Sequence, residues 1–138
     1  MRGFLLVRSG DRRFGLPVEH LVEVLEPGAV FAVPSLDPAV RGVTSLRGRL
    51  IPLVHLGALL DGTACPASSG GTGIIVTVGC GRVCLEVDEA EAVVRGLVVP
   101  APSGAALPWA AGTAQQDGQW IPLLDLSALG ARFKETPR

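Results

Sequence analysis

Residues 48–56 read GRLIPLVHL, and residues 118–126 read GQWIPLLDL. The glycine, the Ile-Pro-Leu run and the final leucine recur at the same spacing, about 70 residues further along the chain. A second pair of segments has nearly the same offset, because Arg13–Glu19 (RFGLPVE) resembles Arg82–Asp88 (RVCLEVD). Two matches at one offset indicate an internal repeat, so we expect two similar units of about 70 residues each.

The composition favours β-structure in both units. The chain has 138 residues, of which 48% are hydrophobic, and its 18 glycines and 11 prolines interrupt it at short intervals. At that density long helices are disfavoured, and many short strands joined by tight turns are expected. Small sheets avoid open edges by curling into barrels. The sequence therefore predicts an all-β fold of two barrels with a groove between them.

Apolar runs bounded by turn residues place the expected elements. Residues 3–7 and 14–17 flank a Ser-Gly-Asp turn and predict a β-hairpin. Residues 18–25 fit a short helical turn leading into a strand, or nearly as well a half-buried strand. Further strands are expected at 30–33, 40–46, 50–56, 74–78, 83–87, 92–99 and 120–124, short helices at 57–60 and 126–129, loops at 61–73 and 100–117, and a frayed tail at 131–138.

The charged residues exclude several chemistries. The net charge is −1, so no general attraction to nucleic acid or to an anionic membrane is expected. Lys134 is the only lysine and stands in the polar tail, which argues against a phosphate-binding loop or a Schiff base. No nucleophile stands beside a general base, so we expect no catalytic residues. No segment approaches the roughly 20 apolar residues of a membrane helix.

Cysteine and histidine give little support to a metal site. Cys65, Cys80 and Cys84 form no Cys-x-x-Cys pair, and the chain has two histidines, so we expect no metal and no cofactor. We interpret the cysteines as reduced, partly buried thiols of a cytosolic protein. His55 ends an apolar strand and is interpreted as structural. Asp125, at the matching place in the second unit, is expected to cap the helical turn that follows.

Residues 42–54 (GVTSLRGRLIPLV) closely resemble the signature of the CheW-like coupling proteins of bacterial chemotaxis. The likeness extends to FGLPVEHLVEVL at 14–25, CLEVD at 84–88 and IPLLDL at 121–126, in the order that the family shows. It covers about residues 3–130. Three departures stand out, because His55 replaces the usual aspartate, Ser45 replaces a common asparagine, and residues 99–117 match poorly.

The resemblance implies a single CheW-like domain over residues 1–138, built of two interlocked SH3-like five-stranded barrels. It implies a cytoplasmic adapter with no enzyme activity, cofactor, nucleic-acid partner or membrane insertion. Such an adapter links the cytoplasmic tip of a chemoreceptor to the regulatory domain of the histidine kinase CheA. Two alternatives stay open: a relative that binds only the receptor or only the kinase, and a small β-barrel enzyme or ligand-binding protein.

The resemblance also implies the interaction residues. Arg47 lies in a turn between two strands, where its guanidinium points outward and can make forked hydrogen bonds. Gly42 lies in the same motif, and a backbone constraint explains it equally well. Leu21, Val22 and Glu23 belong to the segment that lines the receptor groove, where apolar anchors with a polar rim would receive a helix tip. Periodicity does not say which of these side chains face outward.

The two tryptophans are expected in different environments. Trp120 stands in a predicted strand and is expected in the core. Trp109 stands in a proline-rich loop and is the better candidate for a contact surface.

Overall fold

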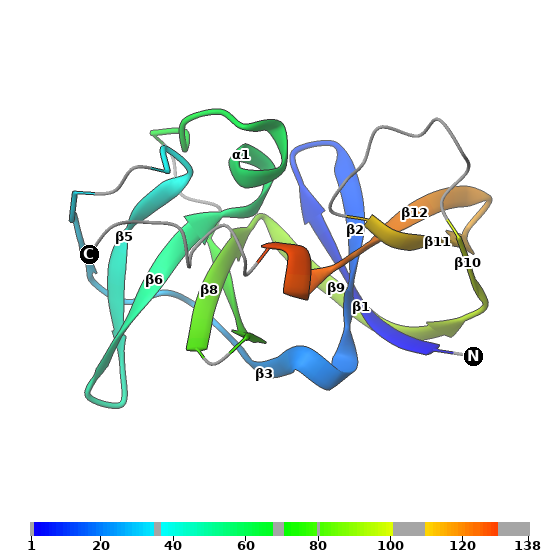
Figure 1. Cartoon of the computed structure of the whole chain (residues 1–138), viewed down its shortest axis with the longest axis horizontal. Helices are drawn as coiled ribbons and strands as arrows, with labels where there is room; N and C mark the ends of the chain where they lie inside the picture. Colours follow the sequence, from blue (N-terminus) through cyan, green and yellow to red (C-terminus); the bar gives the residue numbers. More distant parts are fainter. Residues whose placement is uncertain (1, 35–36, 68–70, 80, 101–109, 130–138) are drawn as a thin grey trace.

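Two curled β-sheets lie side by side and make up most of the molecule in the computed structural model (Figure 1). The structure describes residues 2–34, 37–67, 71–79, 81–100 and 110–129. The all-β fold with two repeated sheets is confirmed. Each sheet has six strands rather than five, because a two-residue strand pairs at one edge of each. Within the described ranges, no helix is long and apolar enough to cross a membrane.

Sheet 1 combines the beginning of the chain with its last third. Its strand order is β10-β11-β12-β2-β1-β9. An antiparallel hairpin formed by β1 and β2 confirms the first predicted hairpin. The strands of sheet 1 are β1 (Arg2–Ser9), β2 (Arg12–Pro17), β9 (Glu89–Gly96), β10 (Val98–Val99), β11 (Ala110–Gln116) and β12 (Gln119–Leu124).

Sheet 2 is formed by the middle of the chain. Its strand order is β3-β7-β8-β6-β5-β4. A 3-10 turn, η1 (Val18–His20), leads into β3 as expected, and the helix α1 (Leu56–Asp61) follows β6. The strands of sheet 2 are β3 (Leu21–Leu25), β4 (Val30–Phe31), β5 (Val40–Leu46), β6 (Arg49–His55), β7 (Thr72–Val78) and β8 (Gly81–Val87).

The two repeats exchange strands, so neither sequence half forms a sheet alone. The first half gives β1 and β2 to sheet 1, and the second half gives β7 and β8 to sheet 2. Each exchange is completed by one parallel pairing, β12 with β2 and β6 with β8. The loop expected at 61–73 to separate the halves consequently connects two elements of sheet 2, since α1 includes Asp61 and β7 begins at Thr72. The internal repeat is still visible in the structure. When each strand is matched to its counterpart in the other repeat, the two sheets have the same strand order.

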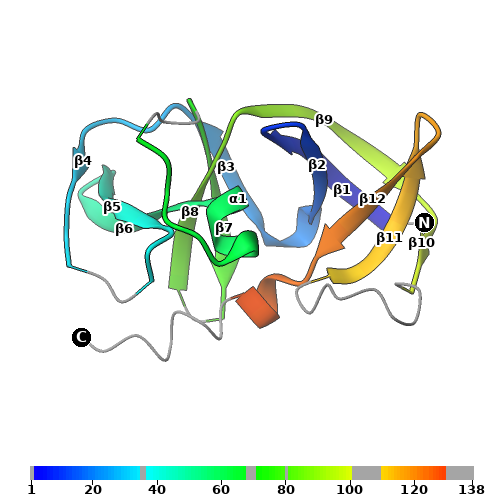
Figure 2. The same cartoon turned by 90° about the horizontal axis from the view of Figure 1, so that it is seen from above.

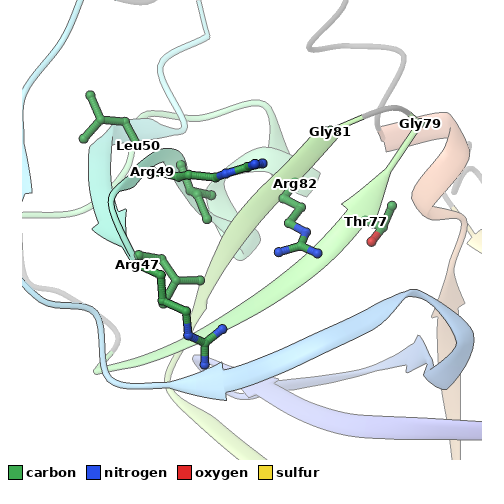
Figure 3. A pocket seen from close by; sticks show the side chains of 9 residues that line it. Arg47, Arg49, Leu50, Thr77, Gly79, Gly81 and Arg82 are labelled. Atoms are coloured by element: carbon green, nitrogen blue, oxygen red, sulfur yellow. The ribbon is translucent and has the colours of Figure 1, made fainter.

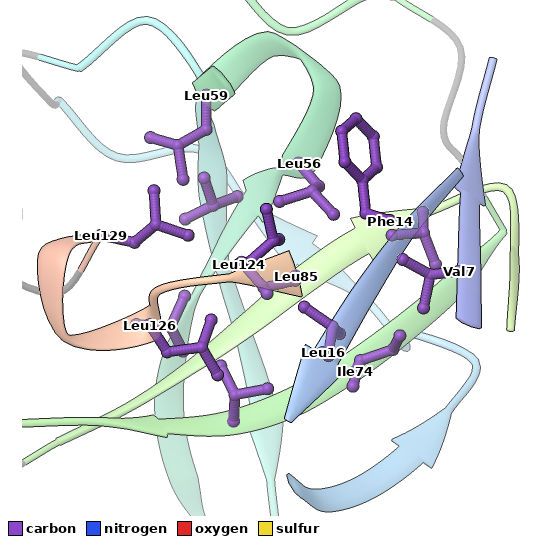
Figure 4. Packing of buried hydrophobic residues seen from close by; sticks show 14 of the residues in the cluster. Val7, Phe14, Leu16, Leu56, Leu59, Ile74, Leu85, Leu124, Leu126 and Leu129 are labelled. Atoms are coloured by element: carbon purple, nitrogen blue, oxygen red, sulfur yellow. The ribbon is translucent and has the colours of Figure 1, made fainter. Parts of the chain in front are cut away.

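The largest hydrophobic cluster joins the two sheets. Figure 4 shows side chains of β1 and β2 packed against α1, β7 and β8 and against the helical turn after β12. Figure 2 places α1 at the junction of the sheets. Smaller clusters fill the interior of each sheet. β1 and β7 each lie between the interior of their own sheet and the core at the junction. Both faces of these strands are therefore buried, which explains their unbroken apolar runs.

Two expectations about the second repeat were wrong. Residues 110–116 form β11 rather than part of a loop, because pairing with β12 stabilises a segment of low β-propensity. Trp120 is 61% exposed rather than in the core, because Ile121 and Leu123 occupy the inward positions of β12. The short helix at 126–129 is confirmed. Trp109 and the tail at 131–138 lie outside the described residues.

Candidate functional site

Arg47 occupies a turn position that strongly favours other residues. Arg47 and Gly48 join β5 to β6 with φ angles of 51° and 81°, as a two-residue hairpin of type I′ requires. Asn, Asp and Gly tolerate that conformation best. The equivalent turn of sheet 1 has Asp117 and Gly118 with φ angles of 50° and 77°. The fold thus accepts an aspartate here, so the turn itself does not explain the arginine.

Arg47 reaches from the hairpin tip to the edge strand β3. Its Nη2 donates to Oε1 of Glu23 over 2.7 Å, with side-chain exposures of 70% and 29%. An ion pair this exposed contributes less than about 1 kcal/mol to stability. Its consequence is geometric, because it holds a mostly solvated guanidinium beside β3. Two residues that the sequence singled out are therefore in contact.

The strand β3 divides its side chains between two environments. Leu21 packs against the junction core, whereas Val22 is 38% exposed and its neighbour Val24 is also exposed. Among the described residues, β3 lies at an edge of sheet 2 and has β7 as its one pairing partner. The exposed valines and the Arg47–Glu23 pair together give this edge both apolar and charged groups, a combination typical of binding surfaces.

Gly42 is buried within the same hairpin at an irregular step in the β5–β6 register. Its φ of 157° is rare for L side chains, and a Cβ there would collide with the carbonyl oxygen of Phe31 and lie 3.2 Å from Ala32 Cα. A Cβ at Gly112, at the equivalent place in sheet 1, would lie 2.8 Å from the carbonyl oxygen of Val99. The close approach of β4 accounts for Gly42, and contact with a partner through it stays a prediction.

Gly42→Ala is expected to lower the free energy of unfolding by about 1–2 kcal/mol, since either β4 or β5 must shift. Urea denaturation measures the effect. Gly28→Ala is the matched control, because a Cβ at Gly28 meets nothing within 4 Å and no left-handed φ is involved. Equal stability of the two variants would contradict the assigned backbone constraint.

A buried ion pair lies behind the hairpin. Nε of Arg41 donates to both carboxylate oxygens of Glu86 over 3.0 Å, and its Nη2 donates to Oε1 over 2.7 Å. The Glu86 side chain is 1% exposed. These hydrogen bonds raise the pKa of Arg41 above its ordinary value. The pair fixes β5 to β8 across the strand exchange, and no sequence motif indicated it.

The structural interpretations of His55 and Asp125 are confirmed. His55 Nδ1 accepts a hydrogen bond from Ala58 N over 3.0 Å at the start of α1. Asp125 Oδ1 accepts from Ala128 N over 3.1 Å at the start of the second helical turn. Each side chain satisfies an otherwise unpaired backbone donor, which is the role of an N-cap. Histidine at position 55 therefore has the same capping role as aspartate at position 125.

The cysteines do not form a reactive centre among the described residues. Cys84 is fully buried, and burial raises the pKa of its thiol to about 12, so it is un-ionised at neutral pH. Cys65 is half-buried, and Cys80 lies outside the described residues. In the part of the chain that the structure describes, no three His, Cys, Asp or Glu side chains are grouped as a metal site requires.

Cys84 is expected to resist alkylation by iodoacetamide at about pH 8, where only the thiolate reacts. Mass spectrometry of the native and the urea-unfolded chain measures labelling at each cysteine. Cys84 should be labelled only after unfolding, whereas half-buried Cys65 provides the internal reference. Rapid labelling of Cys84 in the folded chain would show that the thiol is accessible and ionised.

Comparisons with known proteins agree with this architecture. A family model described as the CheW-like domain matches residues 3–133. Protein FrzA of Myxococcus xanthus is 38% identical over 53 residues, which cover 38% of this chain and 33% of FrzA. The crystal structure of the scaffolding protein TtCheW from Thermoanaerobacter tengcongensis has a TM-score of 0.81 and 21% identity, and the match covers 93% of this chain and 91% of that one.

Proposed function

This chain belongs to the CheW-like domain family, and on that premise we propose that it is a non-enzymatic adapter that couples a chemoreceptor to the histidine kinase CheA. The Arg47 guanidinium carries the proposal. It is 70% exposed and held by Glu23 at the edge strand β3, in a turn conformation that disfavours arginine. An arginine in a conformation that the turn disfavours points to a role outside the fold.

The receptor is the partner proposed for this edge. Val22 and Val24 offer apolar side chains on one face of β3, and the Arg47–Glu23 pair adds charged groups on the other face of the same edge strand. An amphipathic helix tip presents the complementary arrangement, with apolar side chains flanked by polar ones. The two sheets repeat one architecture, so sheet 1 offers a second surface, which is the one proposed for the regulatory domain of the kinase. Two different surfaces on one body are what bridging requires.

Residues 1–138 are proposed to act as one domain in the cytoplasm, without a cofactor. The strand exchange and the shared junction core support one domain, because neither sheet can be removed without opening the other. The family match over residues 3–133 supports the same extent.

Binding of both partners by the isolated chain tests the proposal. The chain is immobilised and exposed to a receptor cytoplasmic fragment and to the kinase regulatory domain, separately and then together. A bridging adapter binds each with micromolar affinity, as in dynamic assemblies, and the two signals add. Binding of one partner alone would support the one-sided relative, and mutually exclusive binding would contradict bridging.

A further inference from the structure

A positively charged hollow opens at one end of sheet 2. It has a volume of about 520 Å³ and lies between the β5–β6 hairpin tip and the turn from β7 to β8. Figure 3 shows Arg47 and Arg49 of the hairpin and Arg82 of β8 around it. Two hairpins that are distant in sequence therefore bring three guanidinium groups to one cavity.

Two of these arginines lack a carboxylate partner among the described residues. Arg49 and Arg82 make no ion pair there, whereas every other described arginine except Arg95 pairs with an acidic side chain. The described residues that line the hollow include no aspartate or glutamate. Positive charge is thus concentrated at this place in a chain whose net charge is −1.

The repeat shows that the fold does not require these arginines. The positions in sheet 1 that match Arg47 and Arg49 are Asp117 and Gln119. The position that matches Arg82 is Arg13, and its charge is neutralised by Glu91 over 2.8 Å and by Asp117 over 3.8 Å. Arg13 is therefore compensated at the end of sheet 1, whereas Arg82, together with Arg49, has no acidic partner among the described residues at the equivalent end of sheet 2.

We propose that the hollow of Arg47, Arg49 and Arg82 binds a protein segment that carries clustered carboxylates. The planar fork of each guanidinium matches a carboxylate in two parallel hydrogen bonds. Arg47 already holds the carboxylate of Glu23 at the rim over 2.7 Å. Leu50 is exposed beside the arginines, and an apolar side chain of the segment would pack on it.

The same features disfavour nucleic acid as the ligand. No aromatic side chain of the described residues lines the hollow to stack a base, and three arginines in one cavity form no stripe that follows a phosphate backbone. The inference does not depend on which protein supplies the acidic segment. Failure of receptor or kinase binding would therefore leave it intact.

Titration of the ¹⁵N-labelled full chain with blocked hexaglutamate tests the proposal. Amide shifts are expected in residues 46–51 and 77–82, and not with blocked hexaglutamine. Binding should weaken at least tenfold when the ionic strength rises from about 20 to about 150 mM, because the charges are exposed and screened. Absence of these shifts, or an equal response to hexaglutamine, would overturn the proposal.

Paired variants separate this hollow from general surface charge. The double variant Arg49→Gln with Arg82→Gln, which gives position 49 the residue found at Gln119, should weaken hexaglutamate binding at least tenfold. Arg95→Gln removes an arginine on β9 that also has no ion pair among the described residues. This variant should change the affinity for hexaglutamate less than twofold. Unchanged amide spectra elsewhere establish folding. Equal losses in both variants, or tighter binding of inorganic phosphate than of hexaglutamate, would contradict a carboxylate site.

Discussion

Replacing Arg41 with alanine is expected to lower the free energy of unfolding by about 3–5 kcal/mol. The change leaves the carboxylate of Glu86, which is 1% exposed, without the three hydrogen bonds that Arg41 donates to it. A buried charge without a partner retains its desolvation penalty and loses the attraction that offset it. Urea denaturation of the variant and of the unmodified chain measures the difference.

The Arg12–Asp61 pair provides a matched control. This Arg–carboxylate pair has two hydrogen bonds, both 2.8 Å long, but its side chains are 43% and 46% exposed. Arg12→Ala should therefore cost less than about 1 kcal/mol. The double variant Arg41→Met with Glu86→Leu should recover most of the loss, since an apolar pair of similar volume carries no desolvation cost. Equal costs for Arg41→Ala and Arg12→Ala would show that burial of the pair is unimportant.

Arg47→Ala is expected to weaken binding of a receptor cytoplasmic fragment by about 1–3 kcal/mol, the range for losing a charged hydrogen-bonding group at an interface. Stability should hardly change, because the side chain is 70% exposed. Arg47→Asn is the sharper variant. Asparagine tolerates the left-handed turn better than arginine, so this variant should bind the receptor weakly and melt at the same or a slightly higher temperature.

Two further variants define the role of Arg47. Arg47→Lys keeps the charge without the planar fork and should bind with intermediate affinity. Arg95→Asn removes an exposed arginine from sheet 1 and should bind normally. Isothermal calorimetry gives the affinities, and thermal denaturation followed by circular dichroism gives the stabilities. Normal receptor binding by Arg47→Asn would refute the proposed contact, and a large loss of stability would make Arg47 structural.

Most strands were predictable because their apolar runs are bounded by glycine, proline and polar turns. The strand at 110–116 (AAGTAQQ) was missed because its residues have little β-propensity, and its pairing with β12 is what stabilises it. The repeat contained the missing signal, since these residues match β5. Trp120 was misplaced because apolar residues occupy both faces of β12, so the pattern does not show which face is inward.

The candidate site was less predictable than the fold because its contacts join distant segments. Arg47 and Glu23 each stood out in the sequence, yet their ion pair depends on β3 and the hairpin tip meeting across sheet 2. Arg82 reaches the same end only because β8 crosses from the second repeat and pairs in parallel with β6. Such exchange leaves no local pattern, since it arises from long-range packing rather than from turn chemistry.

Co-sedimentation of this chain with receptor-containing membranes and soluble CheA tests the bridging adapter most directly. Receptor with kinase, receptor with this chain, and all three together are centrifuged under the same conditions, and the pellets are compared. The account predicts that the kinase enters the pellet only when both the receptor and this chain are present, and that Arg47→Asn reduces its recovery. If this chain pellets with the receptor while the kinase stays in the supernatant, bridging is contradicted.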